Sequence, residues 1–195
     1  MSKIFHIMGK SASGKDTVYK EMQGYFPMLK NVVLYTTRPQ RYGEIGGKEY
    51  HFITDEQMDE FIDSGKVLEL RAYHTVQGIW KYATIDDGQI DLNNYSYLMI
   101  GTLESYEKLR ERLGAGNLMP IYIEISDLDR LLRALEREKE QKDPDYREVC
   151  RRFLADENDF SKEKLQNLEI SRKFDNTNYE LCIRDVKNYI ESFIS

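Results

Sequence analysis

The chain begins with a short apolar run, a glycine-rich loop and an amphipathic stretch. The run from Lys3 to Met8 is rich in β-preferring residues and stops at Gly9, which predicts a short buried strand. Beyond the loop, Val18, Met22 and Tyr25 recur with the spacing of one helix face. The hydrophobic pattern therefore predicts a strand, a loop and a helix in direct succession.

The pattern changes between residues 31 and 88. Residues 31–35 predict a second strand, and the polar, glycine-containing stretch 38–48 predicts a loop. A strand at 50–53 is followed by a helix that begins at Thr54, with Met58, Phe61 and Ile62 expected to face inward. Strands at 67–75 and 80–85 are predicted to form a hairpin. Residues 36–88 are therefore expected to form a small, mostly antiparallel unit inserted in the chain.

Apolar runs separated by amphipathic stretches return after residue 94. Strands are predicted at 95–100 and 119–125, with Phe174 in a last strand and a helix from Thr102 between the first two. That helix is expected to bury Tyr106, Leu109 and Leu113. One face of the C-terminal helix carries Tyr179, Cys182, Ile183, Val186, Ile190 and Phe193. Strands that alternate with helices favour an α/β fold with a parallel core sheet, whose ligands bind at the carboxyl ends of the strands.

Residues 127–159 carry arginines at helical spacing. One stripe holds Leu128, Leu131, Leu132 and Leu135, and another face holds Arg130, Arg133 and Arg137. A polar link leads to a second helix with Arg147, Arg151 and Arg152. Two arginine-bearing helices on a polar hinge favour a lid over polyphosphate, and a solvated charged face is the alternative that this pattern leaves open.

Composition limits the partners of this fold. The 195 residues are 41% hydrophobic, which is enough for one substantial core. The net charge of −6 argues against a general nucleic-acid or membrane-surface binder, so local Lys and Arg clusters must hold any anionic ligand. We expect no signal peptide and no membrane helix, because no run approaches about 18 apolar residues. The distant Cys150 and Cys182, with Cys182 expected in the core, fit a reducing, cytoplasmic location.

The first loop has the composition of a phosphate-binding loop. Its residues are Gly9, Lys10, Ser11, Ala12, Ser13, Gly14, Lys15, Asp16 and Thr17. Backbone N–H groups at a helix start can cradle phosphate oxygens, and Lys15 can reach the β- and γ-phosphates. The strict pattern has Ser or Thr directly after the lysine, where this chain has Asp16. We expect Asp16 to hold Mg²⁺ directly or through water, which leaves Thr17 for the α-phosphate.

A second motif begins at Thr36-Thr37-Arg38 and ends at Tyr50-His51-Phe52, with Arg41 and Glu44 between them. With the upstream loop, it resembles the signature of the guanylate kinase family, and the resemblance covers essentially the whole chain. It implies a P-loop kinase fold in one domain. The implied parts are a core of residues 1–35, 89–126 and 160–195, a nucleoside-monophosphate-binding insertion at 36–88 and a helical lid at 127–159.

The resemblance also implies roles for individual residues. It implies that the loop residues and Asn176 bind ATP, and that Lys15, Arg133, Arg137 and Arg152 act on the transferring phosphoryl group. It also implies a set of residues that bind GMP: Arg38, Arg41, Glu44, Tyr50, Glu69, Tyr82 and Thr84. Two arginines can fork onto the acceptor phosphate while Tyr50 donates a third hydrogen bond. Glu69 would accept hydrogen bonds from guanine and reject adenine, which would leave the carboxylate unpaired.

The chain departs from the family pattern in three places. Leu34 stands where the family usually has serine, and Lys81 stands where it has a tyrosine, with Tyr82 one residue later. The strand that ends at residues 98–102 lacks two alternating carboxylates that help with the acceptor nucleoside and the metal. These departures concern guanine specificity more than ATP binding.

The expected function is ATP-dependent phosphorylation of GMP to GDP, with ATP and Mg²⁺ as cofactors. Expected partners are small molecules, without nucleic acid or a membrane, and the chain is expected to be a monomer or a homodimer. One alternative is a kinase of another phosphorylated acceptor, such as ribose 1,5-bisphosphate, which the missing carboxylates favour. The other is a non-catalytic guanylate-kinase-like module that binds phosphopeptides, against which the intact glycine loop and Lys15 argue.

Overall fold

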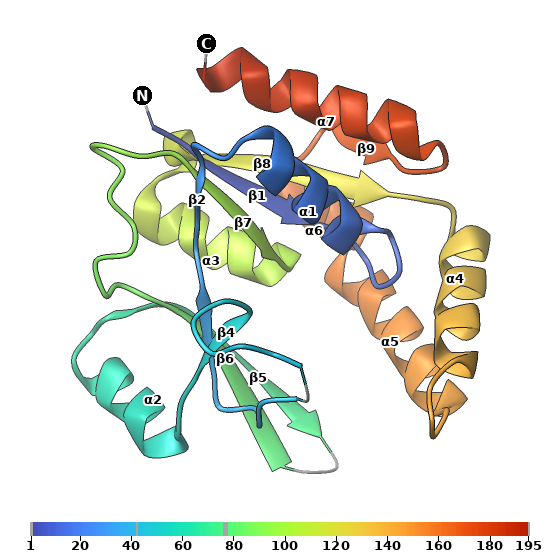
Figure 1. Cartoon of the computed structure of the whole chain (residues 1–195), viewed down its shortest axis with the longest axis horizontal. Helices are drawn as coiled ribbons and strands as arrows, with labels where there is room; N and C mark the ends of the chain where they lie inside the picture. The colour runs from blue at the N-terminus through green and yellow to red at the C-terminus, as the bar shows by residue number, and fades with distance from the viewer. Residues whose placement is uncertain (1, 42, 76–77, 195) are drawn as a thin grey trace.

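The computed structural model describes residues 2–41, 43–75 and 78–194. Its centre is a five-stranded parallel sheet in the order β2-β7-β1-β8-β9 (Figure 1). The strands are β1 (Ile4–Met8), β2 (Lys30–Asn31), β7 (Tyr97–Gly101), β8 (Leu118–Glu124) and β9 (Lys173–Asp175). Every residue of β1 is buried, because helices cover both faces of the sheet. That burial explains why the strand is a continuous apolar run in place of an alternating pattern.

Helices cover the parallel sheet on its two faces. Helices α1 (Lys15–Tyr25) and α7 (Tyr179–Ile194) cover one face, and α3 (Leu103–Leu113) and α6 (Lys162–Asn167) cover the other (Figure 1). A short 3₁₀ turn at Ala115–Asn117 leads from α3 into β8. Alternate residues of β1 enter the two apolar clusters, with Ile4 and Met8 on the α3 side and Phe5 and Ile7 on the α1 side. The predicted α/β fold with a parallel core is confirmed.

A second, four-stranded sheet in the order β4-β3-β6-β5 lies between β2 and β7 in the sequence. Its strands are β3 (Leu34–Thr36), β4 (Tyr50–Phe52), β5 (Val67–Thr75) and β6 (Gly78–Ile85). Strands β3 and β4 are parallel, and the other two pairs are antiparallel. Helix α2 (Asp55–Asp63) begins with a capping box between Thr54 and Gln57 and buries Met58. The predicted hairpin and the predicted N-cap are both confirmed.

Helices α4 (Asp127–Lys139) and α5 (Tyr146–Asp159) lie side by side at the other end of the molecule (Figure 1). The leucine stripe of α4 does not form a core, because Leu128 and Leu132 are 67% and 49% exposed. The buried residue of α4 is Arg130, which is 1% exposed. No helix in the described part of the chain is long and apolar enough to cross a membrane.

The prediction of one continuous strand at residues 31–35 is wrong. Two strands occur there, β2 in the parallel sheet and β3 in the second sheet, and Val32 and Val33 connect them. The Val33 N–H donates to the Gln89 side-chain Oε1 at 2.8 Å. It therefore does not pair with a neighbouring strand; it pairs with residues 86–96, the segment that leads back from the second sheet to the parallel sheet. Local apolar content predicts extended backbone here but carries no information on which sheet receives it.

Four residues predicted to face inward are exposed. Tyr25 is 47% exposed, Ile62 is 40% exposed, and Tyr179 and Phe193 are 40% and 38% exposed. Each lies in the first or last turns of its helix, where the face extends past the sheet beneath it. Cys182 is buried in the core as predicted. The six-residue helix α6 was not predicted, since its mostly polar sequence has too few residues for a periodic signal.

Candidate active site

The loop between β1 and α1 has left-handed backbone conformations that few residue types adopt easily. Gly14 has a left-handed φ of 89°, and Ala12 has a φ of 60°. A Cβ on Gly9 would lie 2.5 Å from the carbonyl oxygen of Ile123. The loop is therefore tightly curved against β8, and it ends directly in the first turn of α1, at the positive end of the helix dipole. Lys15 Nζ lies 3.6 Å from Asp16 Oδ2 at that turn.

Asn176 and Arg133 lie against this loop from the other side. Asn176 is buried, and its Nδ2 donates to the Ser13 carbonyl at 2.8 Å. A Cβ on Gly14 would lie 2.2 Å from that amide nitrogen and 3.6 Å from Arg133 Nη1. Arg133 Nη2 also donates to the Asn176 carbonyl at 3.4 Å. The predicted ATP-side residues from three distant segments are thus brought together, with the Asn176 amide bracing the loop backbone.

Two loop residues are bonded to α5. The Ser11 N–H donates to Asp156 Oδ2 at 2.8 Å, and Lys10 Nζ donates to Glu157 Oε1 at 2.5 Å. Sequence reasoning missed both acids. No local signal could have found them, because they lie about 145 residues away and α5 carries other carboxylates at similar spacing. The loop and the helical pair are therefore one connected structure in this conformation.

The three predicted lid arginines are exposed and lie on α4 and α5. Arg137 and Arg152 line a small cavity between the two helices, together with Ser11 of the loop. Arg152 Nε donates to Glu148 at 2.7 Å. Hydrogen bonds from Arg151 and then Arg152 lower the pKa of Glu148 to about 2, so this carboxylate stays ionised at neutral pH.

Arg130 does not join that exposed group, contrary to the predicted arginine face. Its guanidinium binds Asp127, Asp156 and Glu157, at 3.1, 2.9 and 2.7 Å. The Phe153 ring lies 4.0 Å from its Cζ. Arg130 therefore joins α4 to α5, and Asp156 accepts both from it and from the phosphate loop.

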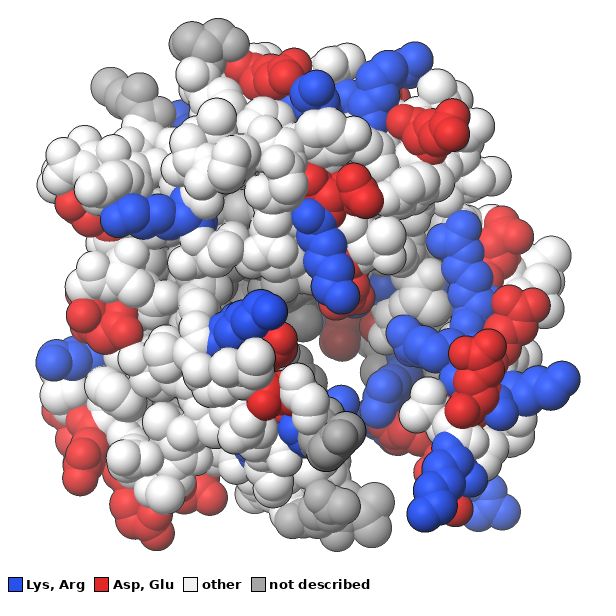
Figure 2. Space-filling model, viewed as in Figure 1, with Lys and Arg blue, Asp and Glu red and all other residues white. Residues whose placement is uncertain are grey.

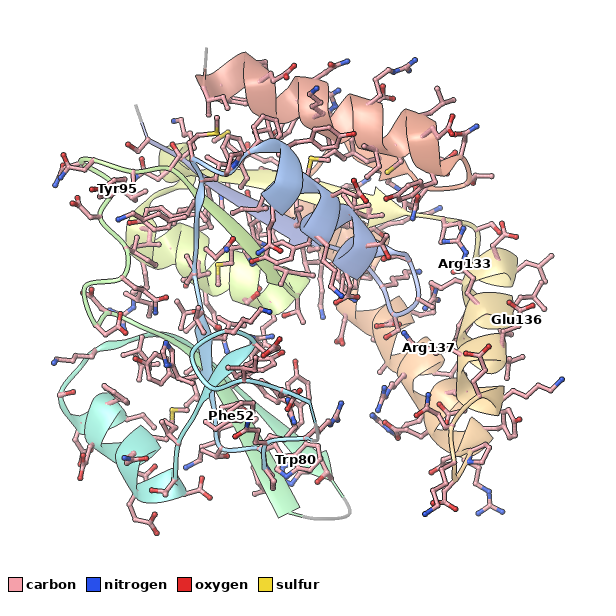
Figure 3. All side chains as sticks on the ribbon, viewed as in Figure 1. Phe52, Trp80, Tyr95, Arg133, Glu136 and Arg137 are labelled. Carbon is pink, nitrogen blue, oxygen red and sulfur yellow. The ribbon has the colours of Figure 1, made fainter. Side chains whose placement is uncertain are left out.

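A hollow separates the helical pair from the second sheet. Figure 2 shows this hollow, with Lys and Arg side chains gathered along its α4–α5 border. Figure 3 places Arg133 and Arg137 on that border and Phe52 and Trp80 across the hollow on the second sheet. The hollow is the place where an anionic ligand can meet cations from both units.

Arg38 and Glu44 form a bidentate pair in the loop of the second sheet. Arg38 is 4% exposed, and its Nη1 and Nη2 lie 3.0 and 2.8 Å from the two Glu44 oxygens. The hydrogen bond from Arg38 holds the pKa of the Glu44 carboxyl below its usual range. The Arg41 N–H donates to the same carboxylate at 2.7 Å, and the Arg41 side chain is exposed. Glu44 thus holds the two predicted phosphate-binding arginines together.

Two tyrosines border the Arg38 side chain. The Tyr50 ring centroid lies 5.4 Å from Arg38 Cζ, and the Tyr50 and Tyr82 rings meet edge to face at 5.7 Å. Burial raises the pKa of Tyr50, so its phenol stays protonated near neutral pH and remains able to donate a hydrogen bond. These predicted residues from β4 and β6 therefore meet around one guanidinium.

Glu69 and Thr84 are direct cross-strand partners on β5 and β6. Glu69 is 2% exposed, and Thr84 Oγ1 donates to its Oε1 at 2.9 Å. The predicted pair is thus brought together. Sequence reasoning missed Arg71, whose guanidinium also binds Glu69. A signal for it existed, because residues two apart on a strand share a face.

The end of β7 is closed around Gly101. A Cβ on Gly101 would lie 2.4 Å from Ser105 Oγ and 2.7 Å from His6 Nε2. His6 and Ser105 are themselves 3.2 Å apart in the core. A side chain at residue 101 would have to displace Ser105 or His6 from this packing.

His6 makes the stability of the chain depend on pH. Burial, and secondarily the positive charge of Arg71, lower the pKa of His6 from 6.5 to about 3. The unfolded chain binds a proton near pH 6.5 while the folded chain does not, so the free energy of unfolding falls as pH decreases from 6.5 to 3. We expect His6→Gln to remove a slope of at most about 1.4 kcal/mol per pH unit in urea unfolding.

The exposed His74 offers the matched control for this measurement, and His74→Gln is expected to keep the slope of the parent chain. Urea curves for the parent and both variants at pH 4, 5, 6 and 7 would decide the matter. A His6→Gln curve parallel to the parent curve over this range would contradict the assignment.

One guanylate kinase family model matches residues 1–192 of this chain. A guanylate kinase of Geobacter metallireducens is 38% identical over 71 residues, which cover 36% of this chain and 35% of the relative. A guanylate kinase of Tropheryma whipplei is 38% identical over 78 residues, which cover 40% and 39% of the two chains. The chain therefore spans well under half of the length of these curated relatives.

The fold has a solved counterpart. A crystal structure of guanylate kinase from Anaplasma phagocytophilum matches with a TM-score of 0.62 at 19% identity, over 98% of this chain and 85% of that one. At this identity the likeness concerns the fold. Because the family model matches residues 1–192 of the 195, the chain belongs to the guanylate kinase family.

Proposed function

We propose that the protein transfers the γ-phosphoryl group of ATP to GMP and so forms ADP and GDP. The observation that carries this proposal is the arrangement around the hollow. A glycine loop with Lys15 lies on the parallel sheet, and the Arg38, Arg41 and Tyr50 cluster lies on the second sheet. Two separate phosphate-binding groups in one member of this family are what a phosphoryl donor and a phosphate-bearing acceptor require.

The proposed mechanism is positioning and charge neutralisation. Phosphoryl transfer passes through a loose transition state with negative charge spread over the phosphoryl oxygens. Lys15 and the loop N–H groups hold the donor phosphates, and Arg38, Arg41 and Tyr50 hold the acceptor phosphate. Arg133, Arg137 and Arg152 neutralise the negative charge on the transferring phosphoryl group. The acceptor phosphate is already a nucleophile at neutral pH, so no general base is needed.

The residues at the start of α1 fit a magnesium ion. Asp16 is exposed beside Lys15, and the exposed Thr17 follows it. Mg²⁺ is commonly held by one or two carboxylates with substrate phosphates and water, and the described residues contain no cluster of three His, Cys, Asp or Glu for an all-protein site. Asp16 would hold the ion directly or through water, and the ion would neutralise charge between the β- and γ-phosphates.

Closure of two parts over the substrates would suppress hydrolysis of ATP. In this proposal residues 36–88 form the acceptor-binding unit and residues 127–159 form the lid, on a core of residues 1–35, 89–126 and 160–195. Both parts border the hollow in Figure 2, and their approach would exclude water from the phosphates. Arg38 would then share its fork between Glu44 and the acceptor phosphate.

A coupled ADP-release assay with MgATP tests the function. The acceptor panel is GMP, dGMP, AMP, CMP, UMP and ribose 1,5-bisphosphate. We expect strong preference for GMP and loss of that preference in Glu69→Ala, because guanine can donate its N1–H to the Glu69 carboxylate and adenine has no N1–H. The exposed Glu60→Ala is the matched control and should behave like the parent.

Other outcomes would replace the proposal in defined ways. Preference for another acceptor, ribose 1,5-bisphosphate included, would retain the phosphoryl transfer and change the substrate. ATP binding without transfer to any acceptor would favour a non-catalytic binding module.

A further inference from the structure

Asp156 of α5 is a carboxylate that the proposed mechanism does not use, although it contacts the phosphate loop. One of its oxygens, Oδ2, accepts from the Ser11 N–H at 2.8 Å and from Arg130 Nη1 at 2.9 Å. The next residue, Glu157, repeats this arrangement, since its Oε1 accepts from Lys10 Nζ at 2.5 Å and from Arg130 Nη2 at 2.7 Å. Two successive loop residues are therefore held by two successive acids of α5, which the Arg130 guanidinium joins.

The loop backbone next to these contacts is strained. Ala12 has a left-handed φ of 60°, a conformation that a residue with a Cβ rarely adopts and that the surrounding structure must hold. The Ser11 N–H before it is fixed by Asp156. The Ser13 carbonyl after it accepts from Asn176 Nδ2 at 2.8 Å. Two hydrogen bonds from distant segments therefore bracket the strained residue and hold the loop in its curved form.

The charges around Asp156 are matched, which matters because an unpaired carboxylate beside a phosphate-binding loop would repel ATP. The negative charges of Asp156 and Glu157 are in contact with two positive charges, those of Lys10 and Arg130. A third acid, Asp127, lies near both cations, but its side chain is 58% exposed, so water and salt screen its charge. The network can therefore hold the loop while it adds little net charge against an anionic ligand.

We propose that Asp156 is a positioning residue for ATP binding, which keeps the phosphate loop in the curved form that its N–H groups need to face the phosphates. This inference rests on the proposed function, because it takes ATP as the ligand of the loop. Asp156 acts through the Ser11 N–H and makes no contact with the nucleotide. A loop that already has its binding conformation loses less entropy when ATP binds, so the expected effect is on ATP affinity.

A comparison of Asp156→Ala with Asp156→Asn separates positioning from stability. Alanine removes the acceptor of the Ser11 N–H, whereas asparagine can place one neutral oxygen where Oδ2 lies and keep this bond. The exposed Asp159→Ala is the matched control from the same helix. Titration calorimetry would measure the dissociation constants of MgATP and of GMP for the parent chain and each variant, and thermal unfolding would give each melting temperature.

We expect Asp156→Ala to bind MgATP about 10- to 100-fold more weakly than the parent chain, the effect of one hydrogen bond to a charged group. GMP affinity should change less than about twofold, since the acceptor cluster lies on the second sheet. Asp156→Asn should recover most of the MgATP affinity although its melting temperature falls, because a neutral amide keeps the Ser11 bond and weakens the bond to Arg130. Asp159→Ala should equal the parent chain in both affinities.

Contrary outcomes are distinct. Parent-like MgATP affinity in folded Asp156→Ala would confine Asp156 to stability, and tighter binding would mean that its carboxylate competes with a phosphate for the loop. Either result overturns the positioning role.

If Asp156→Ala does not fold, Asp156→Glu decides. Glutamate keeps the charge beside Arg130 but carries its oxygens one methylene further, away from their place at the Ser11 N–H. Weaker MgATP binding is therefore expected, and parent-like binding overturns the inference. A parent chain that shows the expected affinities but transfers no phosphoryl group overturns the proposed function alone. A parent chain without MgATP binding overturns both.

Discussion

Replacement of Lys15 by alanine is expected to abolish ATP-dependent phosphorylation of GMP while the fold stays intact. Lys15 is the loop cation that the proposed mechanism assigns to the β- and γ-phosphates. Among the described residues its ion-pair partner is the exposed Asp16, at 3.6 Å. An ion pair with an exposed carboxylate contributes little to stability, so the fold should persist without it. A cation that stabilises the transition-state charge of phosphoryl transfer is worth about 10³- to 10⁵-fold in kcat, and we expect a loss of this order. The coupled ADP-release assay measures this directly.

Lys20→Ala is the matched control for this prediction. Lys20 is an exposed lysine of the same helix, one turn beyond the loop. We expect its kcat and its melting temperature to equal those of the parent chain, and the melting temperature of Lys15→Ala to do the same. Parent-like turnover in a folded Lys15→Ala would remove the loop from the mechanism.

Replacement of Arg130 by methionine is expected to have the largest effect on stability. Its guanidinium is buried and binds three carboxylates, of which Asp156 is itself 14% exposed. Methionine leaves Asp156 buried without its cation, and breaking one side of such a pair costs about 3 kcal/mol. Urea unfolding should show a lower midpoint. Asp156 also accepts from the Ser11 N–H of the phosphate loop, so its displacement would disturb the loop. The affinity for ATP should therefore fall as well.

Arg130→Lys and Lys139→Met separate the causes. A lysine keeps the charge of Arg130 but can reach fewer of the three carboxylates, so an intermediate midpoint is expected. Lys139 is an exposed residue at the end of α4, and its replacement should leave the urea midpoint unchanged. A parent-like midpoint in Arg130→Met would mean that the network adds nothing net to stability.

The local hydrophobic pattern was sufficient to predict an element wherever that element buries one face. The order of β1, the glycine loop and α1 was predictable because a buried strand and an amphipathic helix have different periods. The N-cap at Thr54 was predictable from the residue type before the helix, and the β5–β6 hairpin was predictable from alternation. These features depend on contacts within a few residues.

The features that pattern could not predict depend on distant contacts. Arg130 has the spacing of a solvated or ligand-binding arginine, and only Asp156 and Glu157, which α5 brings next to it, make it a buried structural residue. The same acids hold Lys10 and Ser11 of the loop. Val32 and Val33 were predicted to lie within one strand because they are apolar, but they connect two strands in different sheets.

Part of the site was accessible from the resemblance and part was not. The signature residues Arg38, Glu44 and Tyr50 do meet, because a fixed loop length between β3 and β4 brings them together. Arg71 lies outside that signature, and its burial beside Glu69 follows from α3 covering this part of β5. A single strand sequence does not reveal which helix will cover it.

The connection through Val32 and Val33 also bears on how the proposed acceptor-binding unit, residues 36–88, would move. The chain leaves the core there and returns near Gln89, and the Val33–Gln89 hydrogen bond ties the outgoing and returning segments at one point. Two chain crossings that are joined at one point favour rotation about that point over sliding along the sheet. In the proposed closure, residues 36–88 would rotate there toward the phosphate loop. The acceptor phosphate would therefore approach the donor along a single reproducible arc.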